Sequence, residues 1–224
     1  MIGEADVWAH LDALAKPKGS LGALEDPAVA LALTQARIDP LTKPRRIVLF
    51  AADHGVVDEG VSAWPSEVTG MMVQTIIAGQ ASSSALAAAH DCELRLVDVG
   101  VGSPAIEGSP SNFRSERVGQ GTRNLAREPA MSAAQFESAW AVGKDEAERA
   151  FNDGCRLLLA GEIGIGNTTP ASCLTALLSG LDAEAAVGPG AGADEMTVQT
   201  KRRVVRDAIA RARPLLDDDP RSTI

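Results

Sequence analysis

Three short runs of apolar residues recur along the chain, at 47–52 (IVLFAA), 94–100 (LRLVDVG) and 157–162 (LLLAGE). Each run ends in, or is followed closely by, an acidic residue or a glycine. A mainly apolar run of this length is typical of a strand buried on both faces, as in a parallel sheet. The pattern therefore predicts three parallel strands.

Helical spacing of apolar residues separates these strands; Val7, Leu11 and Leu14, for example, fall on one helix face. The predicted helices span residues 5–16, 24–38, 68–78, 82–89, 133–152, 171–178 and 198–212. Strands that alternate with helices predict an α/β domain with a parallel sheet. Residues 102–121 show little periodicity and are predicted to be irregular, and residues 215–224 are typical of a loop between elements.

Composition narrows the class of protein. The chain has 224 residues, of which 45% are hydrophobic and 23% charged, so disorder is excluded. The net charge of −9 disfavours nucleic acid and anionic membrane as partners. Aromatic residues make up only 3% and Tyr is absent, which disfavours base-stacking surfaces and carbohydrate clefts.

The cysteines and the N-terminus indicate a compartment. Three cysteines without a CxxC pair fit neither a disulfide framework nor a zinc site, and they suit a reducing cytoplasm. The acidic N-terminus lacks a signal-peptide pattern, and no apolar run is long enough to span a bilayer. We therefore expect a soluble, cytoplasmic protein.

The strongest candidate for binding chemistry is the glycine-rich segment 161–170 (GEIGIGNTTP), which passes from the third predicted strand into a helix. Glycines let a backbone approach a ligand, Thr168 or Thr169 would cap the helix, and the helix N-terminus would suit a phosphate. The segment lacks the Gly-Lys-Ser/Thr of a P-loop and the glycine order of a dinucleotide site. Phosphate binding and an ordinary glycine-rich turn are equal alternatives.

A second glycine cluster, residues 188–194 (GPGAGAD), precedes a helix that carries Lys201. Two glycine-rich loops and one lysine are typical of a cradle for a single phosphate. The alternative is that Lys201 is a solvated helix charge, as most lysines are.

Polar and aromatic residues follow the first predicted strand. Asp53 and His54 end that strand and would line the same cleft. A structural or hydrogen-bonding role for His54 is favoured over acid/base or metal chemistry, because no second histidine lies nearby in the sequence. Trp64 either covers a planar ligand or packs, and Met72, on the helix after Pro65, either shapes a pocket for an aromatic ring or belongs to the core.

Five blocks of sequence resemble known motifs in their known order. They lie at 16–25 (KPKGSLGALE), 52–69 (ADHGV, EGVS and PxxVT), 121–132 (GTxN and PAMS), 161–169 (GEIGIGNTT) and 187–205 (VGxG, Lys201 and VV). Together they resemble the nicotinate-nucleotide:dimethylbenzimidazole phosphoribosyltransferase family. Five ordered matches over nearly the whole chain are far more specific than any single one.

The resemblance implies a fold and an assembly. It implies an α/β, Rossmann-like three-layer domain at residues 41–224, and a small helical subdomain whose N-terminal helices lie in residues 1–40. Its C-terminal helices would lie beyond residue 224. Family members form homodimers in which the N-terminal helices reach the partner subunit, so residues 5–38 are an expected association surface.

The resemblance also implies a reaction. The family transfers ribose 5-phosphate from nicotinate mononucleotide to 5,6-dimethylbenzimidazole, which gives nicotinate and α-ribazole 5′-phosphate for the lower ligand of cobalamin. No cofactor and no metal is implied. The attacking nitrogen approaches C1′ opposite the nicotinate, and the protein holds the phosphate, aligns the rings and removes a proton.

Site residues follow by similarity. Glu162 would orient substrate at the reaction centre, and Lys201 with the loop amides would hold the phosphate. The implied nicotinate mononucleotide site comprises Glu162, Gly164, Asn167, Thr168, Gly188, Gly190 and Lys201. The implied benzimidazole pocket comprises Trp64, Pro65 and Met72, and some family members carry Ser and Gln in place of Trp64 and Met72, which implies a more apolar pocket here.

Family members continue beyond the loop at 217–220, and their last third holds the glutamate that acts as general base. By similarity this catalytic glutamate would lie beyond Ile224. We therefore expect weak or absent turnover from these 224 residues alone, with Glu162 as the base if turnover is normal. One alternative is a module that binds a nucleotide or a benzimidazole without turnover. Another is a half-enzyme that needs a complementing C-terminal piece.

Overall fold

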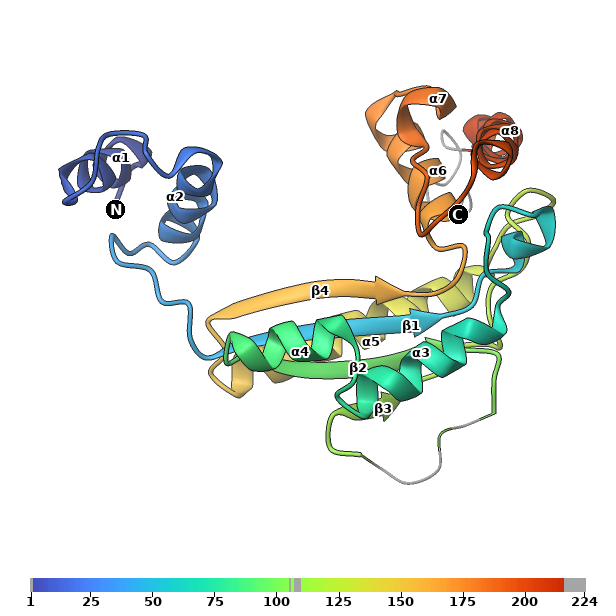
Figure 1. The fold of residues 1–224 in the computed structure, drawn as a ribbon, viewed down its shortest axis with the longest axis horizontal. Coiled ribbons are helices and arrows are strands. Elements are labelled where there is room, and N and C mark those ends of the chain that lie inside the picture. The colour runs from blue at the N-terminus through green and yellow to red at the C-terminus, as the bar shows by residue number, and fades with distance from the viewer. Residues whose placement is uncertain (1, 105, 107–109, 216–224) are drawn as a thin grey trace. The chain divides into compact units, whose positions relative to one another are not determined.

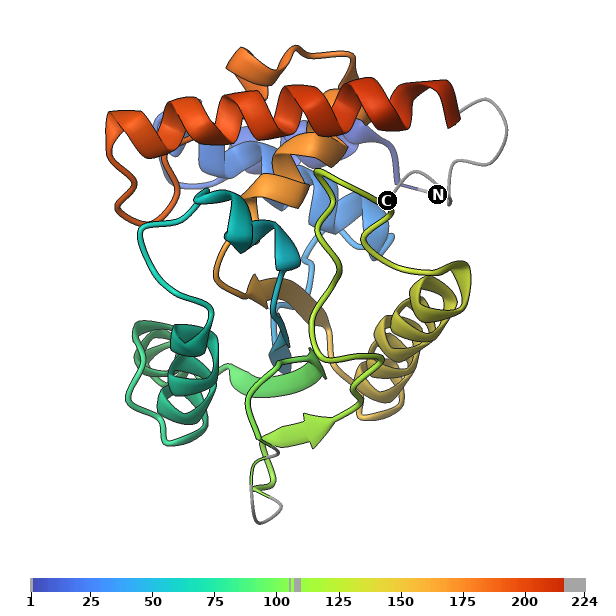
Figure 2. The ribbon, with the colours of Figure 1, turned by 90° about the vertical axis from the view of Figure 1, so that its right-hand side faces the viewer.

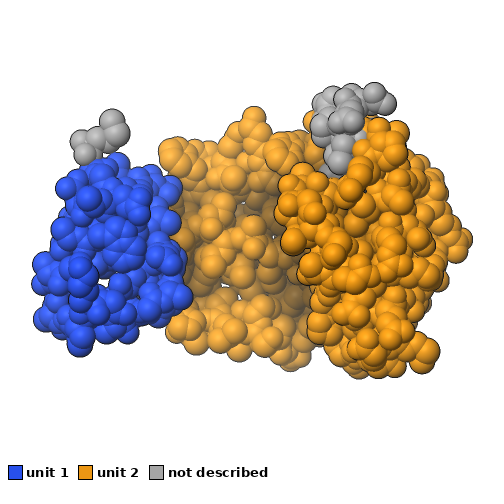
Figure 3. Space-filling model, turned by 90° about the horizontal axis from the view of Figure 1, so that it is seen from above, with its two compact units in different colours: residues 1–44 blue, residues 45–224 orange. Residues whose placement is uncertain are grey.

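The computed structural model describes residues 2–104, 106 and 110–215. The chain divides into two compact units, residues 1–44 and 45–224 (Figure 3). None of the helices in these described ranges is long and apolar enough to cross a lipid bilayer. Each unit buries an apolar core of its own.

The first unit is a pair of helices, α1 (Glu4–Ala13) and α2 (Glu25–Thr34), with a 3-10 turn at Gly22–Leu24 between them. Its core consists of Val7, Val29 and Ala32. The unit is held further by an ion pair of 2.7 Å between Lys16 and the buried Glu25.

Both helices of the first unit end earlier than the sequence predicts. α1 stops before Leu14, which is extended, and Pro17 keeps the residue before it out of the helical conformation. α2 stops because Ala36 adopts a left-handed conformation with φ of 49°, and the Arg37 N–H then bonds back to the Ala32 carbonyl.

The second unit is built on a four-stranded sheet of order β3-β2-β1-β4, in which every pairing is parallel (Figure 1). The strands are β1 (Arg45–Ala52), β2 (Glu93–Gly100), β3 (Phe113–Ser115) and β4 (Leu157–Ile163). The three predicted parallel strands are therefore confirmed, and so is the α/β class.

Helices cover both faces of this sheet (Figure 2). α3 (Glu67–Ile77) and α4 (Ser82–Ala89) lie on one face, and α5 (Ala133–Asn152) lies on the other. On the α3 face, Val73 and Ile76 pack against Leu49 and Leu96. The three-layer arrangement is thus the predicted one.

The prediction that residues 102–121 are irregular is wrong at residues 113–115, which form β3. Three residues are too few to show a period, so the strand is fixed by its neighbour: Phe113 lies opposite Leu96 and packs against the core.

Of the loop predicted at 215–224, only Leu215 lies within the described residues, where it closes a 3-10 turn (Arg213–Leu215). The rest of that segment, including Ile224, lies outside the described residues.

β4 is also less buried than its sequence predicts. Leu158 and Leu159 are 41% and 43% exposed, although a continuous apolar run is typical of burial on both faces. β4 is the edge strand of the described sheet and pairs with β1 alone. As an edge strand, β4 has a neighbouring strand on one side only, whereas β1 has one on each side.

Three further helices lie beyond the carboxyl end of β4 (Figure 2): α6 (Thr168–Ser179), α7 (Ala183–Ala186) and α8 (Glu195–Ala212). Their shared core includes Ala176, Val198, Val204, Val205 and Cys173. Burial raises the pKa of the Cys173 thiol to about 12, so this cysteine stays protonated and acts as a small apolar residue.

Side-chain caps explain why α7 and α8 begin where the apolar periodicity did not predict a helix start. Periodicity does not predict α7, a single turn that starts because Asp182 accepts a hydrogen bond of 2.8 Å from the Ala185 N–H. Asp194 caps α8 in the same way through the Thr197 N–H, which starts that helix three residues earlier than predicted.

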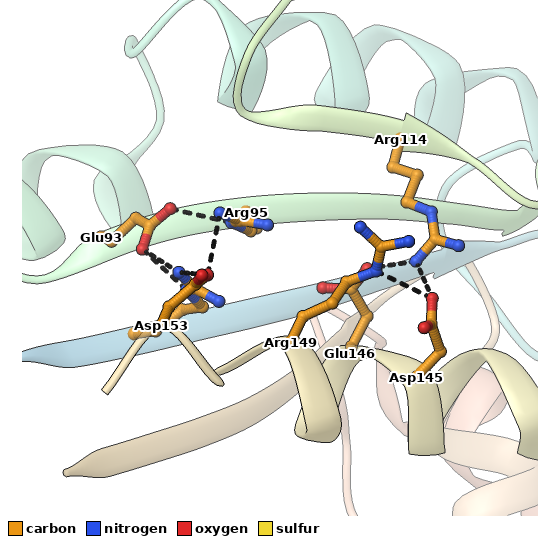
Figure 4. Close-up of polar contacts among 8 residues, drawn as sticks. Glu93, Arg95, Arg114, Asp145, Glu146, Arg149 and Asp153 are labelled. Atoms are coloured by element: carbon orange, nitrogen blue, oxygen red, sulfur yellow. Dashed lines mark hydrogen bonds and ion pairs between the residues drawn. The ribbon is translucent and has the colours of Figure 1, made fainter. Parts of the chain in front are cut away.

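Ion pairs hold α5 against the sheet (Figure 4). Arg114 on β3 contacts Asp145 and, at 2.6 Å, Glu146, which is only 2% exposed. Hydrogen bonds from Arg149 and Arg114 hold the pKa of the Asp145 carboxyl below its usual value. At the other end of α5, the buried Arg46 contacts Asp153 at 2.7 Å.

We predict that Arg114→Met lowers the free energy of unfolding by about 3 kcal/mol, because it leaves the buried Glu146 carboxylate without a counter-ion. Arg149→Met is the matched control, since Arg149 contacts the same Asp145 but is half exposed, and it should cost less than about 1 kcal/mol. Urea unfolding of both variants measures the difference. Equal losses would contradict this account of α5.

Candidate functional site

The ends of β1 and β4 bring two chain segments together. The two strands pair in parallel, with Ala51 opposite Ile163. Residues 53–55 follow β1 and residues 164–167 follow β4, so both segments leave the same edge of the sheet side by side. This edge is where ligands of open parallel sheets bind.

Gly164 is the point at which the two segments touch. A Cβ at this position would lie 2.1 Å from the carbonyl oxygen of Ala52 and 3.0 Å from Nε2 of His54, so only glycine fits. The Asn167 N–H then donates to the Gly164 carbonyl at 3.2 Å and closes the turn from which α6 begins.

Neither predicted threonine caps α6. Asn167 occupies the cap position in a helical conformation and makes no side-chain cap bond. The Asn167 N–H is bonded within the turn, and the helical conformation starts at this residue. Oγ1 of Thr168 accepts a hydrogen bond from Lys201, whereas Oγ1 of Thr169 is buried and has no partner among the described residues.

Lys201 reaches from α8 into the space beside this turn. The residue is 2% exposed, and its Nζ donates to Thr168 Oγ1 at 2.7 Å and to the Gly188 carbonyl at 3.1 Å. An ammonium has three donors, so one is left over. Burial lowers the pKa of Lys201, and among the described residues no carboxylate pairs with it. Lys201 is therefore not a solvated helix charge.

The second glycine-rich loop closes over the same ammonium. Gly190 has φ of 64°, and a Cβ there would lie 3.2 Å from both Lys201 Nζ and Thr168 Oγ1. The indole Nε1–H of Trp64 donates to the Ala191 carbonyl at 3.1 Å. Trp64 thus lies against this loop.

Together the two loops, Trp64 and Lys201 enclose a hollow of about 90 Å³. This volume holds several water molecules or one phosphate group. Of the described side chains that line it, Lys201 is the only charged one. The hollow is therefore a small, cationic space between two backbone turns.

Glu162 lies beside the hollow, near the end of β4. Its Oε1 is 3.0 Å from Nε2 of His54, and its Oε2 is 3.4 Å from Nδ2 of Asn167. Asp53 faces away from this pair, since its Oδ2 accepts a hydrogen bond of 2.7 Å from the Gly102 N–H. The described residues contain no cluster of histidine, cysteine and carboxylate groups that would hold a metal ion.

The general base predicted from the resemblance does not lie among the residues that the structure describes. The resemblance places that glutamate beyond Ile224, and Ile224 itself lies outside the described residues. The assignment of the general base therefore stays a prediction. Within the part of the chain that the structure describes, Glu162 contacts both His54 and Asn167, which lines the hollow.

Trp64 lines the hollow, but the other two residues predicted for a benzimidazole pocket do not. Met72 is half-buried on α3 and Pro65 is exposed, and neither lines the hollow. A pocket made by Trp64, Pro65 and Met72 stays a prediction.

Two features were missed in the sequence. Ser62 lines the hollow, and its place beside Trp64 was the one available signal. A second cavity, of about 570 Å³, borders Glu162 on the α5 side and is mainly apolar. Phe136 and Trp140, four residues apart on α5, belong to its lining and were the signal for an apolar helix face there.

Comparison with known proteins gives a consistent result. The family described as Phosphoribosyltransferase (DBI_PRT) matches residues 3–224. The nicotinate-nucleotide–dimethylbenzimidazole phosphoribosyltransferase of Thermus thermophilus is 45% identical over 210 residues, and that of Pseudomonas fluorescens is 43% identical over 202. These matches cover 94% and 90% of the chain, but the chain spans only 62% and 57% of the two relatives.

Solved structures agree with the sequence matches. The crystal structure of CobT from Thermus thermophilus superposes with a TM-score of 0.84 at 43% identity, over 93% of the chain and 62% of CobT. A second crystal structure, of the phosphoribosyltransferase from the same organism, gives a TM-score of 0.85 at 41% identity. This match covers 98% of the chain described here and 64% of the Thermus thermophilus enzyme.

We predict that Gly164→Ala lowers the free energy of unfolding by about 1–3 kcal/mol, because its Cβ must displace the Ala52 backbone. Gly143→Ala is the control: Gly143 lies in α5, a Cβ there meets nothing within 4 Å, and alanine is the better helix former. Thermal unfolding compares the two. An unchanged midpoint for Gly164→Ala would show that the two segments do not touch as described.

Proposed function

The chain belongs to the phosphoribosyltransferase family, and we propose that its protein transfers the ribose 5-phosphate group of nicotinate mononucleotide to 5,6-dimethylbenzimidazole. The relatives' names support this reaction. So does the position of the hollow at the carboxyl edge of a parallel sheet. The described residues would supply the nucleotide side of the site.

One observation carries the proposal: the buried Lys201 ammonium between two glycine-rich loops, with one donor unused among the described residues. A buried charge without a counter-ion is costly, and an anion that enters the hollow removes that cost. The size of the hollow suits a phosphate, and the N-terminus of α6 adds a favourable dipole. These properties support an assignment of the nucleotide's 5′-phosphate to the space beside Lys201 and Thr168.

The remaining parts of the site follow from that placement. With its phosphate in the hollow, the nucleotide extends past Asn167 towards Glu162, which bonds to Asn167. A benzimidazole nitrogen attacks C1′ while the bond from C1′ to the pyridinium nitrogen breaks, and nicotinate leaves with that electron pair. The N–H proton of the other benzimidazole nitrogen passes to the general base, which the resemblance places beyond Ile224. In this placement the Glu162 carboxylate would stabilise the positive charge that develops on the ribose.

The acceptor and the assembly are part of the same proposal. Trp64, Pro65 and Met72 would shape the benzimidazole pocket. A homodimer through residues 5–38 is supported by large apolar side chains exposed on the first unit. These are Leu14, Leu21, Leu24 and Leu33, with exposures between 36% and 69%.

A second candidate is binding of nicotinate mononucleotide without turnover. It is favoured by the lining of the hollow, which among the described residues supplies an ammonium for an anion but no carboxylate that could act as a base. Calorimetry with nicotinate mononucleotide, beside an assay for nicotinate release, separates the candidates. Binding with no product supports the second.

We predict that Lys201→Ala weakens binding of nicotinate mononucleotide by about 1.5–3 kcal/mol, the scale of a hydrogen bond to a charged group. Lys144→Ala is the control, because Lys144 is an exposed lysine on α5. Calorimetry at neutral pH measures both. Unchanged affinity of the Lys201 variant would remove Lys201 from the site.

We also predict that affinity for nicotinate mononucleotide falls as the pH is raised from 7 towards the ordinary lysine pKa of 10.5. Burial lowers the pKa of Lys201, so its ammonium loses its proton below the ordinary lysine pKa. A phosphate monoester has its second pKa near 6, so its charge stays constant there. In Lys201→Met the affinity should be weak at every pH, and a fall with pH as steep as that of the unmodified chain would assign the effect to another group.

A further inference from the structure

His54 is buried next to the proposed reaction centre but has no part in the reaction described above. The residue is 8% exposed, and its Nε2 lies 3.0 Å from Oε1 of Glu162. We assign Nε2 as the donor and the carboxylate as the acceptor of this contact. A hydrogen bond to a carboxylate is stronger than one between neutral groups.

The surrounding backbone fixes the histidine in place. His54 forms an isolated bridge with Thr122, and the next residue, Gly55, lies so close to 122–124 that a Cβ there would approach their backbone to 2.7 Å. The ring itself lies against Gly164, where a Cβ would come to 3.0 Å from Nε2. The His54 backbone is thus held at Thr122, and its ring is held on one side by the Gly164 backbone.

The carboxylate, in contrast, is held by little else. The Glu162 side chain is 43% exposed, and its contact from Oε2 to the Asn167 amide is long at 3.4 Å. Burial therefore does not fix the Glu162 rotamer, whereas the hydrogen bond from the buried histidine does. One carboxylate oxygen is engaged by His54, and lone pairs on the other stay open towards the site.

We propose that His54 is a positioning residue: it holds Oε1 of Glu162 so that Oε2 accepts a hydrogen bond from a ribose hydroxyl of the bound mononucleotide. This inference rests on the proposed function. It assigns His54 a role through Glu162, without contact with the substrate. It also gives a reason for a buried polar side chain at the end of β1.

The test compares His54→Gln with His54→Leu. Glutamine keeps an N–H donor near the position of Nε2, whereas leucine keeps the volume but no donor. Calorimetry with nicotinate mononucleotide and, separately, with inorganic phosphate reports the ribose contact and the phosphate hollow. We expect His54→Leu to weaken mononucleotide binding about tenfold, to leave phosphate binding unchanged, and His54→Gln to restore most of the loss.

A double-mutant cycle tests whether the effect runs through the carboxylate. In a Glu162→Gln background, His54→Leu should cause no further loss, because the group that it positions is already altered. Full additivity would overturn the proposal, as would equal affinities of the leucine variant and the unmodified chain. Equal losses of mononucleotide and phosphate binding in both His54 variants would show a structural role only.

Nuclear magnetic resonance reads the contact without any nucleotide. The chain has three histidines, so His10 and His90 are internal controls. Glu162→Gln should shift the ring nitrogen signals of His54 and leave those of the other two in place. If the unmodified chain binds phosphate but not the mononucleotide, the proposed function fails and the ribose role fails with it. An unshifted His54 signal beside normal mononucleotide binding overturns the positioning role alone.

Discussion

The site depends on the burial of one ammonium group. Lys201 is 2% exposed, and only a hydroxyl and a backbone carbonyl of the described residues satisfy two of its three donors. Such an arrangement costs free energy in the empty protein, because no carboxylate among those residues offsets the charge. The two glycine-rich loops and Trp64 leave room beside the group for a small anion. The buried ammonium thus lowers the stability of the fold and makes the hollow selective for anions.

The sheet determines where this ammonium meets the reacting groups. β1 and β4 are neighbours in parallel register, so His54 and Glu162 emerge at one edge although 108 positions separate them in sequence. Gly164 lets the segments touch, and the turn after it directs Asn167 and Thr168 to the hollow. α3 packs on one face of the sheet by apolar contacts. On the other face, ion pairs at Arg114 and Arg46 hold α5, and a large apolar cavity lies beside Glu162.

Periodicity and motif spacing predicted most of the fold. α4 and α5 have the predicted bounds, since α4 is rich in alanine, a strong helix former, and Ser132 caps the start of α5. β3 and α7 were missed because three- and four-residue elements depend on pairing and capping. In the site, glycine spacing and one lysine predicted the cradle, but not that Thr168 faces Lys201 instead of capping α6. Exposure of β4 was also beyond the sequence, because an apolar run does not reveal which strand lies at an edge.

The central claim is that the phosphate of nicotinate mononucleotide occupies the hollow between the two glycine-rich loops. A crystal structure of the chain with this ligand tests the claim most directly. The account predicts phosphate oxygens within hydrogen-bond distance of Lys201 Nζ, with the ribose towards Asn167 and Glu162. A phosphate bound elsewhere, or an empty hollow at saturating ligand, would contradict it.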